Sequence, residues 1–134
     1  MTGAGYSGTP LAKKLSLKDG LSIWFDKMPE SVRVEIGAVA LDERAEPVAE
    51  LGAAHIFTAD RAAMETRLAE LRGLIAPTGF VWFSWPKKAS KVPTDITEDV
   101  IRAIALPMGW VDVKVCAVDA TWSGLKLMIR KDRR

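Results

Sequence analysis

The sequence is poor in the residues that build metal and redox sites. It holds one cysteine, Cys116, and one histidine, His55, among 134 residues. A single cysteine excludes an intramolecular disulfide and argues against a cysteine-based zinc site. A single histidine also excludes any site that needs two imidazoles. The sequence therefore predicts a chain that folds around an apolar core without covalent or metal cross-links, and we expect no cofactor of these kinds.

An excess of charge of one sign and a long apolar run are also missing. Nineteen Lys and Arg residues against seventeen Asp and Glu residues leave a net charge of +2, which alone does not indicate nucleic-acid binding. Residues 73–86 are uncharged but include Pro77 and Gly79, so they are too short and too interrupted to span a bilayer as a helix. The first ten residues lack the apolar segment of a secretory signal. We therefore expect a cytoplasmic protein that contacts no membrane.

The residues that are present are typical of one soluble globular domain. Apolar residues make up 49% and charged residues 27% of the chain, and a chain of this length buries about two thirds of its unfolded surface. We find no repeat or linker, so residues 1–134 are expected to form one α/β domain with residues 1–8 as a flexible arm. A G-x-G-x-x-G pattern lies in that arm, but no strand precedes it, which argues against a dinucleotide site.

Hydrophobic patterning predicts strands that alternate with helices. Strands are expected over residues 21–26, 38–41, 54–58, 80–85, 110–119 and 125–130. Helices are expected after Thr9 and Pro10, after Pro29, over residues 61–75 behind the capping residue Asp60, and from Asp95 to Pro107. Residues 30–41 are ambiguous, because their alternating valines also fit a strand. Strands joined through helices favour right-handed crossovers, so the predicted fold class is a three-layer α/β, mostly parallel, Rossmann-like sheet that ends in an antiparallel hairpin.

The loop after the strand at residues 80–85 is the main candidate for a binding site. Ligands of open α/β sheets bind beyond the carboxyl ends of the strands, and a helix N-terminus that follows such a loop favours anions. The loop contributes lysines, hydroxyl groups and one aromatic side chain, and the candidate residues are Trp85, Lys87, Lys88, Ser90, Thr94 and Thr97. The alternative is a solvated loop whose lysines balance the acidic residues 95, 98 and 99.

Other conspicuous residues are expected to have structural roles. The chain has five tryptophans, and we assign them to the core. Trp82 and Trp85 lie three positions apart on one strand, so they face opposite sides of the sheet and cannot form one stacking platform. Trp85 and Trp122 are expected to be partly exposed, because both lie beside turns. His55 lies in an apolar strand, which predicts a core or sheet-edge histidine. Cys116 lies in an alternating strand, which predicts a buried, inert thiol.

Three segments together resemble a family of small bacterial proteins classed as a domain of unknown function. They are residues 5–15 (GYSGTPLAKKL), residues 85–99 (WPKKASKVPTDITED) and residues 111–125 (VDVKVCAVDATWSGL). The resemblance covers nearly the whole chain, and the three motifs are specific in combination. It implies no particular activity.

A fainter resemblance is to the S-adenosylmethionine-dependent methyltransferase fold. Residues 71–83 (LRGLIAPTGFVWF) are similar to a helix, Pro-x-Gly turn and strand of those enzymes, and the expected final hairpin is similar to theirs. The resemblance implies a truncated methyltransferase-like sheet. Those enzymes carry an acidic, glycine-rich loop after the first strand, whereas residues 26–29 (DKMP) occupy that place here. We therefore expect no tight binding of S-adenosylmethionine.

Three functions remain as hypotheses. A non-catalytic or partner-binding domain is favoured by the missing glycine-rich loop and by the scarcity of catalytic side chains. The alternative is a small enzyme or ligand-binding protein that takes a phosphorylated or other anionic small molecule at residues 87–97. Nucleic-acid binding is the least favoured, because only the lysine loop and the basic tail support it. The sequence does not indicate an oligomeric state.

Overall fold

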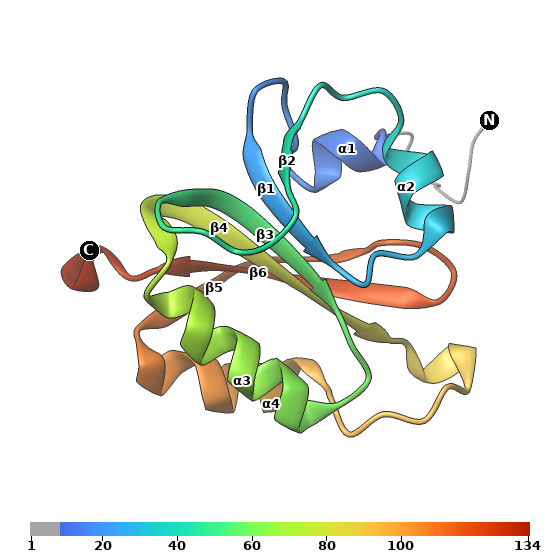
Figure 1. The fold of residues 1–134 in the computed structure, drawn as a ribbon. Coiled ribbons are helices and arrows are strands. Elements are labelled where there is room, and N and C mark those ends of the chain that lie inside the picture. Colours follow the sequence, from blue (N-terminus) through green and yellow to red (C-terminus); the bar gives the residue numbers. More distant parts are fainter. Residues whose placement is uncertain (1–8) are drawn as a thin grey trace.

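One six-stranded sheet organises the chain (Figure 1), and its strands follow the order β2-β1-β3-β4-β6-β5. The computed structural model describes residues 9–134; the expected N-terminal arm and its glycine pattern lie outside the described residues. The strands are β1 (Ser22–Asp26), β2 (Asp42–Arg44), β3 (Leu51–Phe57), β4 (Ile75–Pro86), β5 (Trp110–Ala117) and β6 (Trp122–Ile129). Strands β1 to β4 run parallel, and β6 lies antiparallel between β4 and β5. The predicted sheet with its closing antiparallel hairpin is confirmed.

Helices cover both faces of the sheet and complete three layers (Figure 1). One face carries α1 (Leu11–Lys14) and α2 (Glu30–Ile36), and the other carries α3 (Arg61–Arg72) and α4 (Glu98–Ala105). Short 3-10 turns follow at Lys88–Ser90, Leu106–Met108 and Lys131–Arg133. No helix within residues 9–134 has the length and apolar character to cross a bilayer.

Alternation along the central strands divides the core into two clusters. On β4, Trp82 packs in the cluster under α1 and α2, whereas Phe83 and Trp85 pack in the cluster under α3 and α4. The expectation that Trp82 and Trp85 face opposite sides is therefore confirmed. The buried indole of Trp82 donates to the carbonyl of Leu15 at 3.0 Å, which anchors the turn after α1 to the sheet.

The predicted apolar stripe of α3 is confirmed for its helical part. Met64, Leu68 and Leu71 are fully buried against the sheet, and Asp60 caps the helix by accepting from the amide of Ala63 at 2.9 Å. The stripe does not extend to Ile75, as the spacing had suggested. That residue begins β4, because it pairs with β3, so residues 76–79 belong to the strand and do not end the helix.

Two further expectations need correction. The strand expected at residues 38–41 begins later, at Asp42, as β2. Ala40 is instead bonded to the turn before β1, because its carbonyl accepts from the amide of Gly20 and its amide donates to the carboxylate of Asp19. Trp85 is buried, with 7% of its surface exposed, because Ile96 in the returning loop packs in the same cluster. Trp122 is partly exposed, as expected.

Candidate functional site

The carboxyl ends of β1, β3 and β4 meet at one edge of the sheet. From β1 the chain passes to α2 on one face, and from β3 it passes to α3 on the other face (Figure 1). This divergence between neighbouring parallel strands is the topological switch point, where open α/β sheets place their ligands. A pocket of about 260 Å³ lies there, between Asp26 and Lys27 after β1, Phe57 and Thr58 after β3, and Arg67 on α3.

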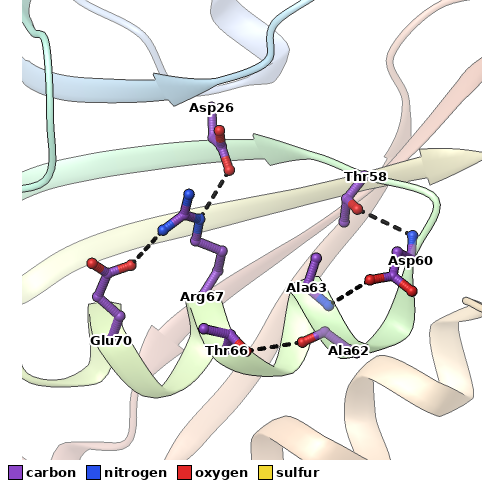
Figure 2. A network of polar contacts seen from close by, with 8 residues as sticks. All are labelled: Asp26, Thr58, Asp60, Ala62, Ala63, Thr66, Arg67 and Glu70. Carbon is purple, nitrogen blue, oxygen red and sulfur yellow. Dashed lines mark hydrogen bonds and ion pairs between the residues drawn. The ribbon is translucent and has the colours of Figure 1, made fainter.

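An arginine from α3 forms an ion pair at the end of β1 (Figure 2). The Nε atom of Arg67 lies 3.0 Å from a carboxylate oxygen of Asp26, and a terminal nitrogen lies 2.8 Å from Glu70. The guanidinium also stands 5.0 Å from the ring centre of Trp24, a distance at which a cation is attracted to an aromatic face. Burial acts to lower the pKa of Arg67, but the hydrogen bonds to Glu70 and Asp26 outweigh it and raise that pKa. The arginine therefore stays charged and ties α3 to β1.

The turn from β1 into α2 is built without glycine. Lys27 adopts a left-handed backbone with φ of 59°, a conformation that costs a non-glycine residue about 1 kcal/mol or more. Pro29 follows as the residue before α2 and has no amide hydrogen to offer a ligand. The end of β1 therefore presents side chains in place of the open backbone that a glycine loop would present.

A second pocket, of about 440 Å³, lies beyond the end of β4. We call it the lysine pocket; its lining is Trp85, Lys87, Lys88, Thr97, Glu98, Asp99 and Ser123. Four of the six residues expected from the sequence thus line one pocket. Glu98 and Asp99 both pair with Arg102, at 3.1 and 3.3 Å, whereas neither lysine forms an ion pair within residues 9–134.

The other two expected site residues shape the loop and lie outside the lining. Ser90 donates to the carbonyl of Lys87 at 2.7 Å and accepts from the amide of Val92. Thr94 donates to the carbonyl of Ala59 at 2.7 Å and accepts from the amide of Ile96. Their hydroxyl groups are already engaged with the backbone.

The cap of α4 also differs from the expectation. Thr97 caps this helix, because its hydroxyl accepts from the amide of Val100 at 3.2 Å. Asp95, the expected cap, instead accepts from the amide of Arg61 at 2.8 Å, at the start of α3. The returning loop brings Asp95 to a free amide of a different helix, and this placement depends on tertiary structure.

Sequence reasoning missed a buried pair between His55 and Ser84. The imidazole Nε2 lies 2.7 Å from the serine hydroxyl, and the ring stacks on Phe57 with 4.1 Å between centroids. Burial lowers the pKa of His55 to about 3, so the ring is neutral at physiological pH. A polar serine inside an otherwise apolar strand was the available signal. Both residues are 1% exposed, so the pair serves packing and is out of reach of a solute.

Neither metal chemistry nor the free thiol adds to this site. Within residues 9–134 no cluster of three or more histidine, cysteine, aspartate and glutamate side chains is arranged to hold a metal ion. Burial raises the pKa of the Cys116 thiol, although the charges of Lys14 and Lys114 oppose the rise. The cysteine is therefore protonated at neutral pH, but it is half-buried and not buried as expected.

Comparison with solved structures identifies the scaffold. A methyltransferase dependent on S-adenosylmethionine from Aquifex aeolicus matches with a TM-score of 0.64 and 14% identity over 89% of each chain. Fibrillarin from Methanococcus jannaschii matches at 0.60 with 9% identity, over 95% of this chain and 72% of that one. Aeropyrum pernix fibrillarin, solved with natively bound S-adenosylmethionine, matches at 0.57 with 11% identity, over 92% of this chain and 70% of that one.

No family model and no curated protein matches the chain, so the resemblance to a small bacterial family stays a prediction. At identities this low, the solved structures establish the fold and carry no chemistry over. The agreement covers nearly the whole chain, including the parallel sheet and its closing antiparallel hairpin. The protein therefore has the fold of the S-adenosylmethionine-dependent methyltransferases.

Proposed function

We propose that the protein is a binding domain that uses the methyltransferase scaffold without transferring methyl groups. The observation that carries the proposal is the end of β1, where Arg67 pairs with both Asp26 and Glu70 and lies over the ring of Trp24. In the enzymes that the sequence resembles, this is the place where a glycine-rich loop lets the backbone approach the cofactor.

The residues at the end of β1 do not fit S-adenosylmethionine. Residues 26–29 contain no glycine, and close approach of backbone to a ligand is the usual reason for glycine at such a turn. The pocket of about 260 Å³ at this point is smaller than the 300–1,000 Å³ that is usual for ligand pockets. The site therefore offers S-adenosylmethionine neither a glycine turn whose backbone it could approach nor a pocket of the usual volume.

The neighbouring strand β2 supports the same conclusion. Nucleotide-binding sheets use an acidic residue near the end of the second strand to hold ribose hydroxyls. Here Asp42 lies 2.8 Å from Arg44, and Glu43 lies 2.7 Å from Arg33. Both carboxylates of β2 itself are thus engaged by arginines, whereas Glu46, two residues beyond the strand, forms no ion pair within residues 9–134 and lends no support here.

Calorimetric titration with S-adenosylmethionine and with S-adenosylhomocysteine tests the proposal. We expect no saturable binding of either compound at micromolar to millimolar concentration. Aeropyrum pernix fibrillarin, whose structure holds S-adenosylmethionine, is the positive control under the same conditions. Micromolar affinity of this protein for either compound would contradict the proposal and favour a methyltransferase.

A variant shows which feature excludes the cofactor. Arg67→Ala removes the ion pairs to Asp26 and Glu70 and leaves residues 26–29 unchanged. We expect this variant to remain unable to bind S-adenosylmethionine, because the turn still lacks glycine. Binding gained on this single change would assign the exclusion to the arginine alone.

The lysine pocket favours a second candidate function, the binding of a phosphorylated or carboxylated small molecule. Its two lysines have no ion-pair partner within residues 9–134, and Arg102 already engages Glu98 and Asp99. The positive N-terminal end of α4 adjoins the pocket, and a helix end of this kind favours anions. These features support an anion bound by direct contacts, since the Debye length is about 8–10 Å at ordinary salt.

Thermal unfolding in phosphate and in sulfate tests this candidate. We expect either salt to raise the melting temperature of the wild type, and to raise it less in the double variant Lys87→Ala, Lys88→Ala. Lys131→Ala, at an exposed lysine near the C-terminus, is the control that should respond like the wild type. An equal rise in melting temperature in all three proteins would contradict this candidate, because it would arise from the general exclusion of these salts from protein surfaces.

A further inference from the structure

Two lysines stand directly opposite each other on the terminal hairpin. Lys114 of β5 and Lys126 of β6 are cross-strand partners, and both reach the end of α1. The ammonium of Lys114 donates to the carbonyl of Lys14 at 3.2 Å, and that of Lys126 donates to the hydroxyl of Ser16 at 2.9 Å. Both positive charges therefore lie on the α1 side of the hairpin.

A third ammonium joins them. Lys14 itself donates from its side chain to the carbonyl of Ala117, the last residue of β5, at 3.0 Å. We call these residues, Lys14, Lys114 and Lys126, the three-lysine cluster. It lies on the opposite face of the sheet from α4 and is therefore separate from the lysine pocket.

The three-lysine cluster has no carboxylate partner in the described part of the chain. None of its three lysines takes part in an ion pair within residues 9–134. Residues 1–8 contain no aspartate or glutamate, so that segment has no carboxylate side chain with which to neutralise them. An anion that neutralises the cluster would therefore come from outside these parts of the chain.

Like charges placed opposite each other on paired strands destabilise the pair. Burial and the charge of Lys114 both lower the pKa of Lys126, whose ammonium lies 4.6 Å from the ring centre of Phe80. Half-buried between this ring and Ser16, Lys126 has little freedom to turn its charge away. An anion between the strands and α1 would relieve the repulsion.

The cluster also has donors to spare and a fixed frame. Each ammonium carries three N–H donors, and the hydrogen bonds described above use one from each lysine. The turn after α1, which receives two of them, is itself held by the buried indole of Trp82 through the carbonyl of Leu15. Lys114 and Lys126 thus reach a segment that the core keeps in place, and Lys14 reaches back from that segment to β5.

From this geometry we propose that the three-lysine cluster binds an oxoanion with the chemistry of a phosphate group. Lys114 and Lys126 contact it from the hairpin, and Lys14 contacts it from α1. The site is independent of the function proposed above, because it involves neither the end of β1 nor the loop after β4.

Titration with inorganic phosphate, followed by amide NMR at constant ionic strength, tests this site. The parent protein is the double variant Lys87→Ala, Lys88→Ala, in which the lysine pocket cannot contribute. We expect saturable shifts confined to residues 14–16, 114–117 and 126. Replacing Lys114 with glutamine should weaken the phosphate affinity at least tenfold, and Lys131→Gln should leave it unchanged.

Lys126→Met is the second variant and should also lose the saturable shifts. Lys114 is exposed, so Lys114→Gln keeps the test decisive if the change at the half-buried Lys126 prevents folding. Linear shifts spread over the whole surface would overturn the proposal. An affinity in Lys114→Gln equal to that of the parent protein would overturn it as well.

Discussion

Arginine and lysine have separate tasks among the charged residues of this protein. Every ion pair within residues 9–134 uses an arginine, and Arg33 contacts both oxygens of Glu43, at 3.1 and 2.7 Å. Such two-point contacts suit the planar guanidinium, whereas an ammonium acts as a compact point charge. The arginines therefore complete the internal network, while the lysines of the two proposed anion sites remain available for external ligands.

Protonation of the buried His55 opposes folding. Its pKa is about 3 in the folded protein and about 6.5 in an unfolded chain. Between these values the unfolded state binds more protons than the folded state, so stability falls as the pH drops below about 6.5. At pH 5 this linkage costs about 2 kcal/mol of unfolding free energy relative to neutral pH.

Urea unfolding at pH 7 and pH 5 measures this loss in the wild type and in His55→Gln. Glutamine keeps a polar partner for Ser84 but does not titrate. The wild type should lose about 2 kcal/mol more than the variant between the two pH values. An equal loss in both proteins would mean that the imidazole is protonated in the folded state or is not buried.

Among the elements, α3 and α4 show how a helix is placed by residues outside its own sequence. The start of α3 receives two carboxylates, Asp60 from its own N-terminus and Asp95 from the loop before α4. With Asp95 engaged there, Thr97 caps α4. The side chain of Asp95 thus connects the N-terminal end of α3 to the loop that leads into α4.

The buried stripe of α3 predicts how this helix responds to mutation. Leu68 is fully buried in the middle of the stripe, so Leu68→Ala should lower the unfolding free energy by about 2–5 kcal/mol. Glu65 is exposed on the same helix, and Glu65→Ala should change it by less than about 0.5 kcal/mol. Chemical denaturation measures the unfolding free energy of both variants. Equal midpoints would show that the face of α3 that contains Leu68 does not pack on the sheet.

At the scale of the whole molecule, β3 and β4 belong to both layers of the core. Ala53, Phe57 and Trp82 pack in the cluster under α1 and α2, whereas Ala54 and Phe83 pack in the cluster under α3 and α4. Adjacent residues of the same strands pack in opposite clusters. Unfolding of one cluster therefore removes strands on which the other cluster packs.

We therefore predict one cooperative unfolding transition. Leu15→Ala, in the cluster under α1 and α2, and Leu68→Ala, in the other cluster, should each shift the tryptophan fluorescence and far-ultraviolet circular dichroism transitions together. The wild type is the reference for both probes. Separate transitions in either variant would divide the chain into two folding units and contradict the expected single domain.

Patterns in the sequence predicted the elements that have a clear local periodicity. The stripe at Met64, Leu68 and Leu71, the strand around Trp82 and the terminal hairpin all arise from periodicity over a few residues, and all three formed. Boundaries were wrong where pairing with a distant strand competed with local pattern. Ile75 continues the helical spacing, yet its pairing with Leu51 of β3 makes it the first residue of β4.

The sequence by itself determined the fold class and the two faces of α3 and β4, because these depend on local spacing. Four residues expected from the sequence line the lysine pocket, and their role as a binding site stays a prediction. Tertiary structure decided which charged side chains meet across different elements, whereas pairs such as Arg67 with Glu70 lie three positions apart on one helix. Arg67 reaches Asp26 across 41 positions, and Lys126 reaches Ser16 across 110. Such contacts depend on strand register and on which face each helix covers, and neither is encoded in the spacing of residues along the chain.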